Sequence, residues 1–256
     1  MGSVRVYLVY PDVTTFHGLP YHPGLASIAA VLREHGHEVK IGHFDHVEQY
    51  KEIVDFVESF EPDVVGFTTV ETQFLHVQRL AAMIKAKRNC VVICGGTYMT
   101  LAPEAALEPG SESLDAIMRG EGEHAFLELV EKIGRGEEYH DTSNLGYINR
   151  QTGRLVLNPL RPAIEHLEEI PHPATDLFEY QKMIDTSNLV LFHFSRGCPY
   201  PCTYCSARVL MMQYGQSIRY RSVESTIEEI KTTVERYCLK PASMLLFSDD
   251  LFTLNK

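Results

Sequence analysis

The sequence of 256 residues contains no apolar run close to the roughly 20 residues that a membrane-spanning helix requires. The first residues, MGSVRV, also lack the charged segment followed by an apolar stretch that marks a secretory signal peptide. We therefore expect a cytoplasmic protein with no membrane span. In that compartment the six cysteines are expected to be thiols or metal ligands before disulfides.

The sequence also has fewer basic than acidic residues. Lysine and arginine number 23 against 34 aspartates and glutamates, which gives a formal net charge of −11 and argues against a nucleic-acid partner. Neither G-x-G-x-x-G nor a Walker P-loop occurs, which disfavours a plain nucleotide-binding role. The hydrophobic content of 45% is that of a globular protein with a sizeable core.

The first half of the chain alternates short apolar segments with amphipathic ones. Leu25, Ile28, Ala29 and Leu32, for example, fall on one helical face. Strands are expected at residues 4–10, 38–42, 63–69, 90–94 and 116–118. This order predicts an α/β fold, a doubly wound Rossmann-like parallel sheet that binds ligands at the carboxyl ends of its strands.

The second half predicts a different organisation. A hairpin is expected around Gln151-Thr152-Gly153, followed by a proline-rich linker, a strand at 189–194, and a strand at 243–248. Between these strands, one helical face is expected to carry Val223, Ile227, Ile230, Val234 and Tyr237, with Ser222 as N-cap. We divide the chain into a first domain over 1–137, a hairpin and linker over 138–187, and a second domain over 188–256.

Three cysteines, Cys198, Cys202 and Cys205, have the spacing C-x3-C-x2-C in a loop rich in glycine and proline. Three thiolates can hold three irons of a [4Fe–4S] cluster and leave the fourth iron open, whereas an electron-transfer cluster generally takes four cysteines. The open iron can bind the amino and carboxylate groups of S-adenosylmethionine (SAM) for reductive cleavage. The alternative is a zinc site completed by His193, although this histidine lies in an apolar strand pattern.

The cysteine loop resembles the signature of the radical SAM superfamily, with Tyr204 as the aromatic residue before the last cysteine. The resemblance implies SAM contacts from Tyr204 and from Ser248, Asp249 and Asp250 at the end of the second barrel strand. The usual Gly-Gly-Glu motif is absent, but a carboxylate still suits the SAM ammonium group. The alternative for the two aspartates is a solvated strand end. Arg219 and Arg221 are expected either to contact a carboxylate or to lie at the surface.

The first domain resembles the cobalamin-binding domain found ahead of many radical SAM domains. The resemblance rests on residues 23–39, Gly66-Phe67-Thr68-Thr69, Cys94-Gly95-Gly96-Thr97 and Arg119-Gly120-Glu121-Gly122-Glu123. It implies cobalamin contacts from the residues His17, Thr68, Thr69, Gly95, Gly96, Thr97, Gly120, Glu121 and Gly122. The motif Asp-x-His-x-x-Gly is absent, so we expect no histidine below the cobalt and a corrin contact from His17 instead.

Together these resemblances imply a cobalamin-dependent radical SAM enzyme, with methyl transfer to an unactivated carbon as the expected reaction. The implied partners are a small-molecule substrate and a reductant such as flavodoxin or ferredoxin. We expect the second domain to be only the start of a (β/α)6 partial barrel.

Three alternatives remain open. The first is a ring-forming or rearranging enzyme of the same family, and the second is a non-catalytic cobalamin-binding fragment. A methylthiotransferase is disfavoured because it needs three more cluster cysteines in the first domain. That domain offers only Cys90 and Cys94, which lie too far apart along a strand to share a metal and are expected to be core thiols.

Overall fold

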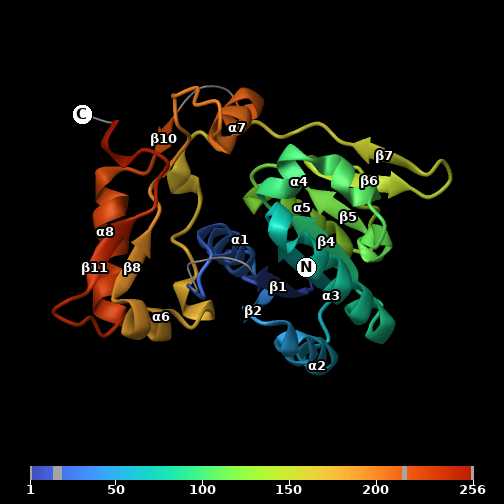
Figure 1. The fold of residues 1–256 in the computed structure, drawn as a ribbon, viewed down its shortest axis with the longest axis horizontal. Helices are drawn as coiled ribbons and strands as arrows, with labels where there is room; N and C mark the ends of the chain where they lie inside the picture. The colour runs from blue at the N-terminus through green and yellow to red at the C-terminus, as the bar shows by residue number, and fades with distance from the viewer. Residues whose placement is uncertain (1, 14–18, 215–217, 255–256) are drawn as a thin grey trace. The chain divides into compact units, whose positions relative to one another are not determined.

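The computed structural model describes residues 2–13, 19–214 and 218–254. It divides into two compact units (Figure 1). The first unit comprises Met1–Gly18 and Ile28–Arg161, and the second comprises Leu19–Ser27 and Pro162–Lys256. No helix in the described ranges is both long and apolar enough to cross a membrane.

The first unit is built on a seven-stranded sheet in the order β2-β1-β3-β4-β5-β6-β7. Its first five strands in this order are parallel, and β6 and β7 are antiparallel additions. The strands are β1 (Arg5–Pro11), β2 (Glu38–Phe44), β3 (Val64–Thr68), β4 (Val91–Gly95), β5 (Ala116–Met118), β6 (Leu145–Asn149) and β7 (Arg154–Leu157). Its helices are α2 (Tyr50–Phe60), α3 (Phe74–Lys87), α4 (Thr97–Leu101) and α5 (Glu123–Gly134), together with the part of α1 (Pro23–Glu34) from Ile28 onward. The predicted doubly wound α/β fold is confirmed.

The core of this unit follows the apolar periodicity of its sequence. All five residues of β3 are buried, as a strand covered on both faces requires. On α3 the spacing i, i+3, i+4, i+7 places Val77, Leu80, Ala81 and Ile84 on the buried face, and all four are fully buried. The short helix α4 had no counterpart in the sequence-based expectation.

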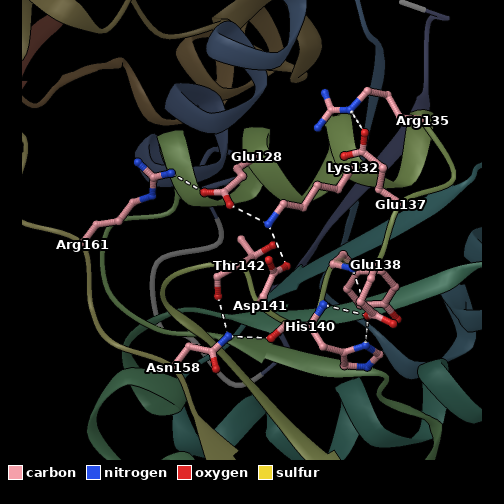
Figure 2. Close-up of polar contacts among 11 residues, drawn as sticks. Glu128, Lys132, Arg135, Glu137, Glu138, His140, Asp141, Thr142, Asn158 and Arg161 are labelled. Carbon is pink, nitrogen blue, oxygen red and sulfur yellow. Dashed lines mark hydrogen bonds and ion pairs between the residues drawn. The ribbon is translucent and has the colours of Figure 1, made fainter.

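The hairpin β6–β7 belongs to the first unit because β6 pairs with β5. Polar contacts tie the segments flanking the hairpin to each other and to α5 (Figure 2). Glu128 on α5 accepts hydrogen bonds from Lys132 and Arg161, and Lys132 also donates to Asp141 at 2.8 Å. Asn158 Nδ2 donates to the carbonyl oxygens of His140 and Thr142, at 2.6 and 2.7 Å. The hairpin thus lies in the first compact unit, and the division into 1–137, 138–187 and 188–256 stays a prediction.

The second unit contains two small pairs of strands. The parallel pair is β8 (Leu189–Phe192) with β11 (Met244–Phe247), and the antiparallel pair is β9 (Ser195–Arg196) with β10 (Arg219–Tyr220). The helices are α6 (Tyr180–Ser187), α7 (Ser206–Tyr214) and α8 (Val223–Arg236). Its core contains Tyr21, Tyr180, Met183, Val190 and Phe192, all buried.

Helix α8 begins as predicted but buries a different face. Ser222 caps it by accepting a hydrogen bond from the backbone N–H of Ser225 at 3.2 Å. Of the expected apolar face, Ile230 and Tyr237 pack against the core, whereas Val223, Ile227 and Val234 are exposed. The buried side chains of α8 are the polar Glu229 and Thr233. The predicted helix and its Ser222 cap are confirmed, and only Ile230 and Tyr237 of the apolar stripe contact the core.

Candidate functional site

The first candidate site is the carboxyl edge of the parallel strands in the first unit. Strands β1, β3, β4 and β5 run in one direction, so their carboxyl ends meet at one edge of the sheet. The predicted cobalamin-contact segments begin at the last residues of β3 and β4 and shortly after the end of β5. Thr68 and Thr69 are buried, Gly95 and Gly96 are half-buried, and Thr97 is exposed at the start of α4.

The glycine pair after β4 packs tightly against the threonine pair after β3. The backbone N–H of Thr69 donates to the carbonyl oxygen of Gly95 at 3.0 Å. Gly96 has a φ of +98°, and a Cβ there would lie 2.6 Å from both the nitrogen and the carbonyl oxygen of Thr69. A Cβ cannot approach backbone that closely, so the fold itself requires glycine at position 96.

A threonine that the sequence did not single out joins these segments to the loop after β5. The hydroxyl of Thr100 on α4 donates to the carbonyl oxygen of Gly96 at 3.0 Å and accepts from the backbone N–H of Gly120 at 2.9 Å. Gly120 therefore does not present a free N–H to a ligand. Helix α5 begins at Glu123 with Gly122 as its N-cap, so Gly120 lies in the loop before the helix.

Asn144 is a second residue that the sequence did not reveal. It is buried and has a φ of +70°, which is uncommon outside glycine. Its Nδ2 donates to the carbonyl oxygen of Glu121 at 3.0 Å, and its Oδ1 accepts from the backbone N–H of Arg161 at 2.5 Å. Asn144 thereby holds the loop that contains the predicted contacts Gly120, Glu121 and Gly122.

The glycines at this edge are partly exposed. Gly95, Gly96, Gly120 and Gly122 are all half-buried. At Gly96 and Gly122 the place of a Cβ is taken by Thr69 and Ile28, so these two glycines serve close packing within the unit. The assignment of this edge to a cobalamin ligand stays a prediction. His17, the expected corrin contact, lies outside the described residues.

The second candidate site is the cysteine loop of the second unit. Cys198 and Cys202 are half-buried, Cys205 is exposed, and all three are free thiols. The loop between β9 and α7 has no regular secondary structure, and Gly197 has a φ of +100°. Across the described ranges, no three His, Cys, Asp or Glu side chains are gathered closely enough to hold a metal ion. The assignment of the three thiols as cluster ligands stays a prediction, based on the chemistry and spacing of the donor set.

His193, the fourth ligand of the zinc alternative, faces strand β11. Its Nδ1 lies 3.2 Å from the backbone carbonyl oxygen of Ser248 and 3.4 Å from the hydroxyl of the same residue. Metal-ligating histidines commonly make such a contact through one ring nitrogen, so the contact does not decide between the cluster and the Cys3His zinc alternative.

The residues predicted to contact SAM differ in how far their side chains are already engaged. The hydroxyl of Ser248 donates to the carbonyl oxygen of Phe192 at 3.0 Å. Asp249 is half-buried and accepts hydrogen bonds from Phe194 and Ser195. Asp250 is exposed, and Tyr204 is 90% exposed in the cysteine loop.

The two arginines after the cysteine loop bind the linker that precedes β8. Arg219 is buried and donates from Nη1 to the carbonyl oxygen of Ile164 at 2.8 Å. Arg221 donates from Nη2 to the carbonyl oxygen of Pro171 at 3.1 Å. Both guanidinium groups therefore have a structural role, which the sequence left open.

The cysteines outside the triplet are also free thiols, and Cys90 and Cys94 lie in the core as predicted. Cys90 and Cys94 are buried, and burial raises the pKa of both thiols, that of Cys94 far above its usual range. A thiol that stays protonated is a poor metal ligand. Cys238 is exposed after α8.

Comparison with known proteins gives matches to both halves of the chain. The B12 binding domain model matches residues 11–130. The uncharacterized methyltransferase PH0819 of Pyrococcus horikoshii is 34% identical over 238 residues, which cover 91% of this chain and 49% of that protein. The anaerobic magnesium-protoporphyrin IX monomethyl ester cyclase of Rubrivivax gelatinosus is 27% identical over 187 residues, covering 71% and 33%. This chain thus spans half or less of the length of these relatives.

Among solved structures, the fold is similar to that of OxsB, a cobalamin-dependent S-adenosylmethionine radical enzyme with aqua-cobalamin and SAM bound. The TM-score is 0.79 at 20% sequence identity, and the match covers 98% of this chain and 34% of the OxsB chain. At this identity the likeness is one of fold. The chain therefore contains a B12-binding domain over residues 11–130, and its fold is similar to that of a cobalamin-dependent radical SAM enzyme, as the resemblance in its sequence predicted.

Proposed function

We propose that this chain binds cobalamin at the carboxyl edge of the first sheet, and a [4Fe–4S] cluster with SAM at the cysteine loop, as part of a radical SAM methyltransferase. One observation carries this proposal. A B12 binding domain over residues 11–130 and a C-x3-C-x2-C triplet directly after β9 occur on the same chain.

Separate groups of residues would bind the cluster, SAM and cobalamin. Cys198, Cys202 and Cys205 would hold the cluster, and the exposed carboxylate of Asp250 suits the SAM ammonium group. Thr68, Thr69, Gly95, Gly96 and Thr97, with the loop Gly120–Gly122, would contact cobalamin. When bound, the cluster supplies the electron that cleaves SAM, and cobalamin supplies the methyl carrier.

The experiment is anaerobic reconstitution of the chain with iron, sulfide and hydroxocobalamin, followed by SAM and reduced flavodoxin. We expect a brown protein that retains cobalamin on desalting and forms 5′-deoxyadenosine, which chromatography detects. The control replaces all three loop cysteines with alanine and should form none. A wild-type protein that takes up neither iron nor cobalamin would contradict the proposal.

Ring formation without net methylation is the second candidate, favoured by the similarity to the Rubrivivax cyclase. Transfer of the labelled methyl group of SAM to a product distinguishes the two reactions. Tight cobalamin binding without any SAM cleavage would instead support the non-catalytic cobalamin-binding alternative.

A further inference from the structure

We propose that Asp249 is a positioning residue that fixes the backbone leading into the cysteine loop, in place of the SAM contact that the sequence implied. The inference rests on the proposed function, since it takes Cys198, Cys202 and Cys205 as the cluster ligands. It assigns the contact with the SAM ammonium group to the neighbouring Asp250.

One carboxylate oxygen of Asp249 gathers three donors from the segment after β8. Its Oδ1 accepts from the backbone N–H of Phe194 at 3.0 Å, from the backbone N–H of Ser195 at 2.5 Å and from the Ser195 hydroxyl at 2.5 Å. Hydrogen bonds to an ionised acceptor are about twice as strong as neutral ones. Asp249 therefore ties the end of β11 to the start of β9 across more than fifty residues of sequence.

The same segment is held from its other side by the residues before α8. The backbone N–H of Arg221 donates to the carbonyl oxygen of Phe194 at 2.8 Å, and Ser195 pairs with Tyr220 across the β9–β10 ladder. Ser195 is 1% exposed. Without the Asp249 carboxylate, two backbone N–H groups in this buried segment would lose their acceptor, and each loss costs free energy.

The fixed segment ends close to the first predicted cluster ligand. Cys198 lies three residues beyond Ser195, and Gly197 between them has the left-handed φ of +100°. If Ser195 moved, Cys198 would therefore move with it, because only two residues separate them. Three thiolates must converge on one cluster, so the position of this first ligand matters for cluster retention.

The neighbouring Asp250, unlike Asp249, makes no polar contact with the described residues that would fix the backbone. Its side chain is exposed, and no hydrogen bond or ion pair of Asp250 is found in the described part of the chain. The Asp249 atom Oδ2, by contrast, is buried and has no hydrogen-bond partner within the described ranges. The two adjacent carboxylates therefore form a matched pair, one directed to the fold and one to solvent.

The first test needs no cluster. Hydrogen exchange of the Phe194 and Ser195 amides is measured by NMR in the apo chain and in the variants Asp249→Ala, Asp249→Asn and Asp250→Ala. We expect exchange about tenfold faster in Asp249→Ala, a smaller increase in Asp249→Asn, which keeps an Oδ1 acceptor, and no change in Asp250→Ala. Wild-type exchange rates in Asp249→Ala would overturn the proposal.

The second test uses the same variants after anaerobic reconstitution with ferrous iron and sulfide. Iron retained after desalting should fall strongly in Asp249→Ala and be unchanged in Asp250→Ala. Addition of SAM should alter the EPR spectrum of the reduced cluster in wild type and in Asp249→Asn but not in Asp250→Ala. Full iron content in Asp249→Ala, with loss of the SAM response, would make Asp249 a SAM contact and refute its positioning role.

Ser195→Ala serves as a second variant if Asp249→Ala does not fold. It removes one of the three donors to Oδ1, so we expect a smaller change of the same sign in amide exchange and iron content. No change in either measurement would count against the proposal. If wild type itself takes up no iron, the proposed function fails, while the exchange measurement still decides whether Asp249 anchors the segment.

Discussion

The carboxyl edge of the first sheet and the cysteine loop of the second unit are held in place by different means. The strands that end at the first site belong to a long parallel ladder, and every residue of β3 is buried. Strand β11, which carries Asp249 at its end, pairs with β8 alone in the described ranges, and its residues Met244, Leu245 and Leu246 are 40% exposed or more. The geometry of the first site is therefore set by the packing of backbone in a buried sheet. The geometry of the second site is set by a few hydrogen bonds from side chains.

The largest effect is expected from filling the close contact at Gly96. Gly96→Ala would place a Cβ 2.6 Å from the Thr69 backbone at a φ of +98°. We expect the free energy of unfolding to fall by about 3 kcal/mol, measured by urea denaturation. Gly36→Ala is the control, because Gly36 also has a positive φ but has open space around it. Equal losses in the two variants would show that packing against Thr69 does not matter.

A comparable but pH-dependent effect is expected from Glu229 in the second unit. Burial raises the pKa of this carboxyl to about 7; the charge of Arg221 partly offsets the rise and that of Asp249 adds to it. Glu229 is 7% exposed and its Oε2 has no hydrogen-bond partner among the described residues. The protonated form is therefore favoured by folding. Its stabilising effect is full below the ordinary carboxyl pKa of about 4.3 and is lost as the pH rises through 7.

Glu229→Gln should remove this pH dependence. At pH 8 the variant should be more stable than wild type by about 2 kcal/mol, and at pH 4.5 the two should be similar. Urea unfolding across this pH range is the measurement. Glu228→Gln, at an exposed position on the same helix, is the control. Identical pH profiles for wild type and Glu229→Gln would contradict the account.

An effect of similar size is expected at Asn144, which holds the loop over Gly120–Gly122. Asn144→Ala loses the hydrogen bonds to Glu121 and Arg161 and places alanine at a positive φ, so unfolding should require about 2 kcal/mol less free energy. Asn144→Gly loses the same hydrogen bonds without backbone strain and should be less affected. Cobalamin affinity, measured by absorbance titration, should fall in both. Wild-type affinity in both variants would separate Asn144 from the cobalamin site.

The smallest effect is expected from the ion-pair network between α5 and the hairpin flanks (Figure 2). Burial opposes ionisation of Glu128, but hydrogen bonds from Lys132 and Arg161 hold its pKa below the ordinary value. Its contribution is present above the unfolded pKa and is lost as the pH falls through the lower folded pKa. Glu128→Gln should cost about 1 kcal/mol at pH 7. Asp55→Asn, in the exposed pair with Lys51, should have no measurable effect.

Much of the first unit could be predicted from its sequence, because its signals are local. The apolar spacing of α3, the alternation of strands with helices, and the hairpin around Gly153 each occupy one short stretch of chain. The predicted contact segments also follow the strand ends where a parallel sheet places its ligands.

The residues that hold the sites together could not be predicted, because their partners are distant in sequence. Thr100 bonds to Gly120, Asn144 to Glu121, and Asp249 to Ser195, and each uses a backbone group that carries no sequence signal. The sequence predicted helix α8 and its Ser222 cap, which are local features. It did not indicate that Glu229 and Thr233 would be the buried residues of this helix, because tertiary packing decides that.

The measurement that tests the account most directly is joint loading of a cysteine variant. Wild type and Cys198→Ala, with Cys238→Ala as a control at a cysteine outside the loop, are reconstituted anaerobically with iron, sulfide and cobalamin and then desalted. Because the two sites are built on different units, Cys198→Ala should lose its cluster iron and keep its cobalamin, while Cys238→Ala keeps both. Retention of a full cluster in Cys198→Ala, or loss of cobalamin together with the iron, would contradict the assignment of the two cofactors to two separate sites.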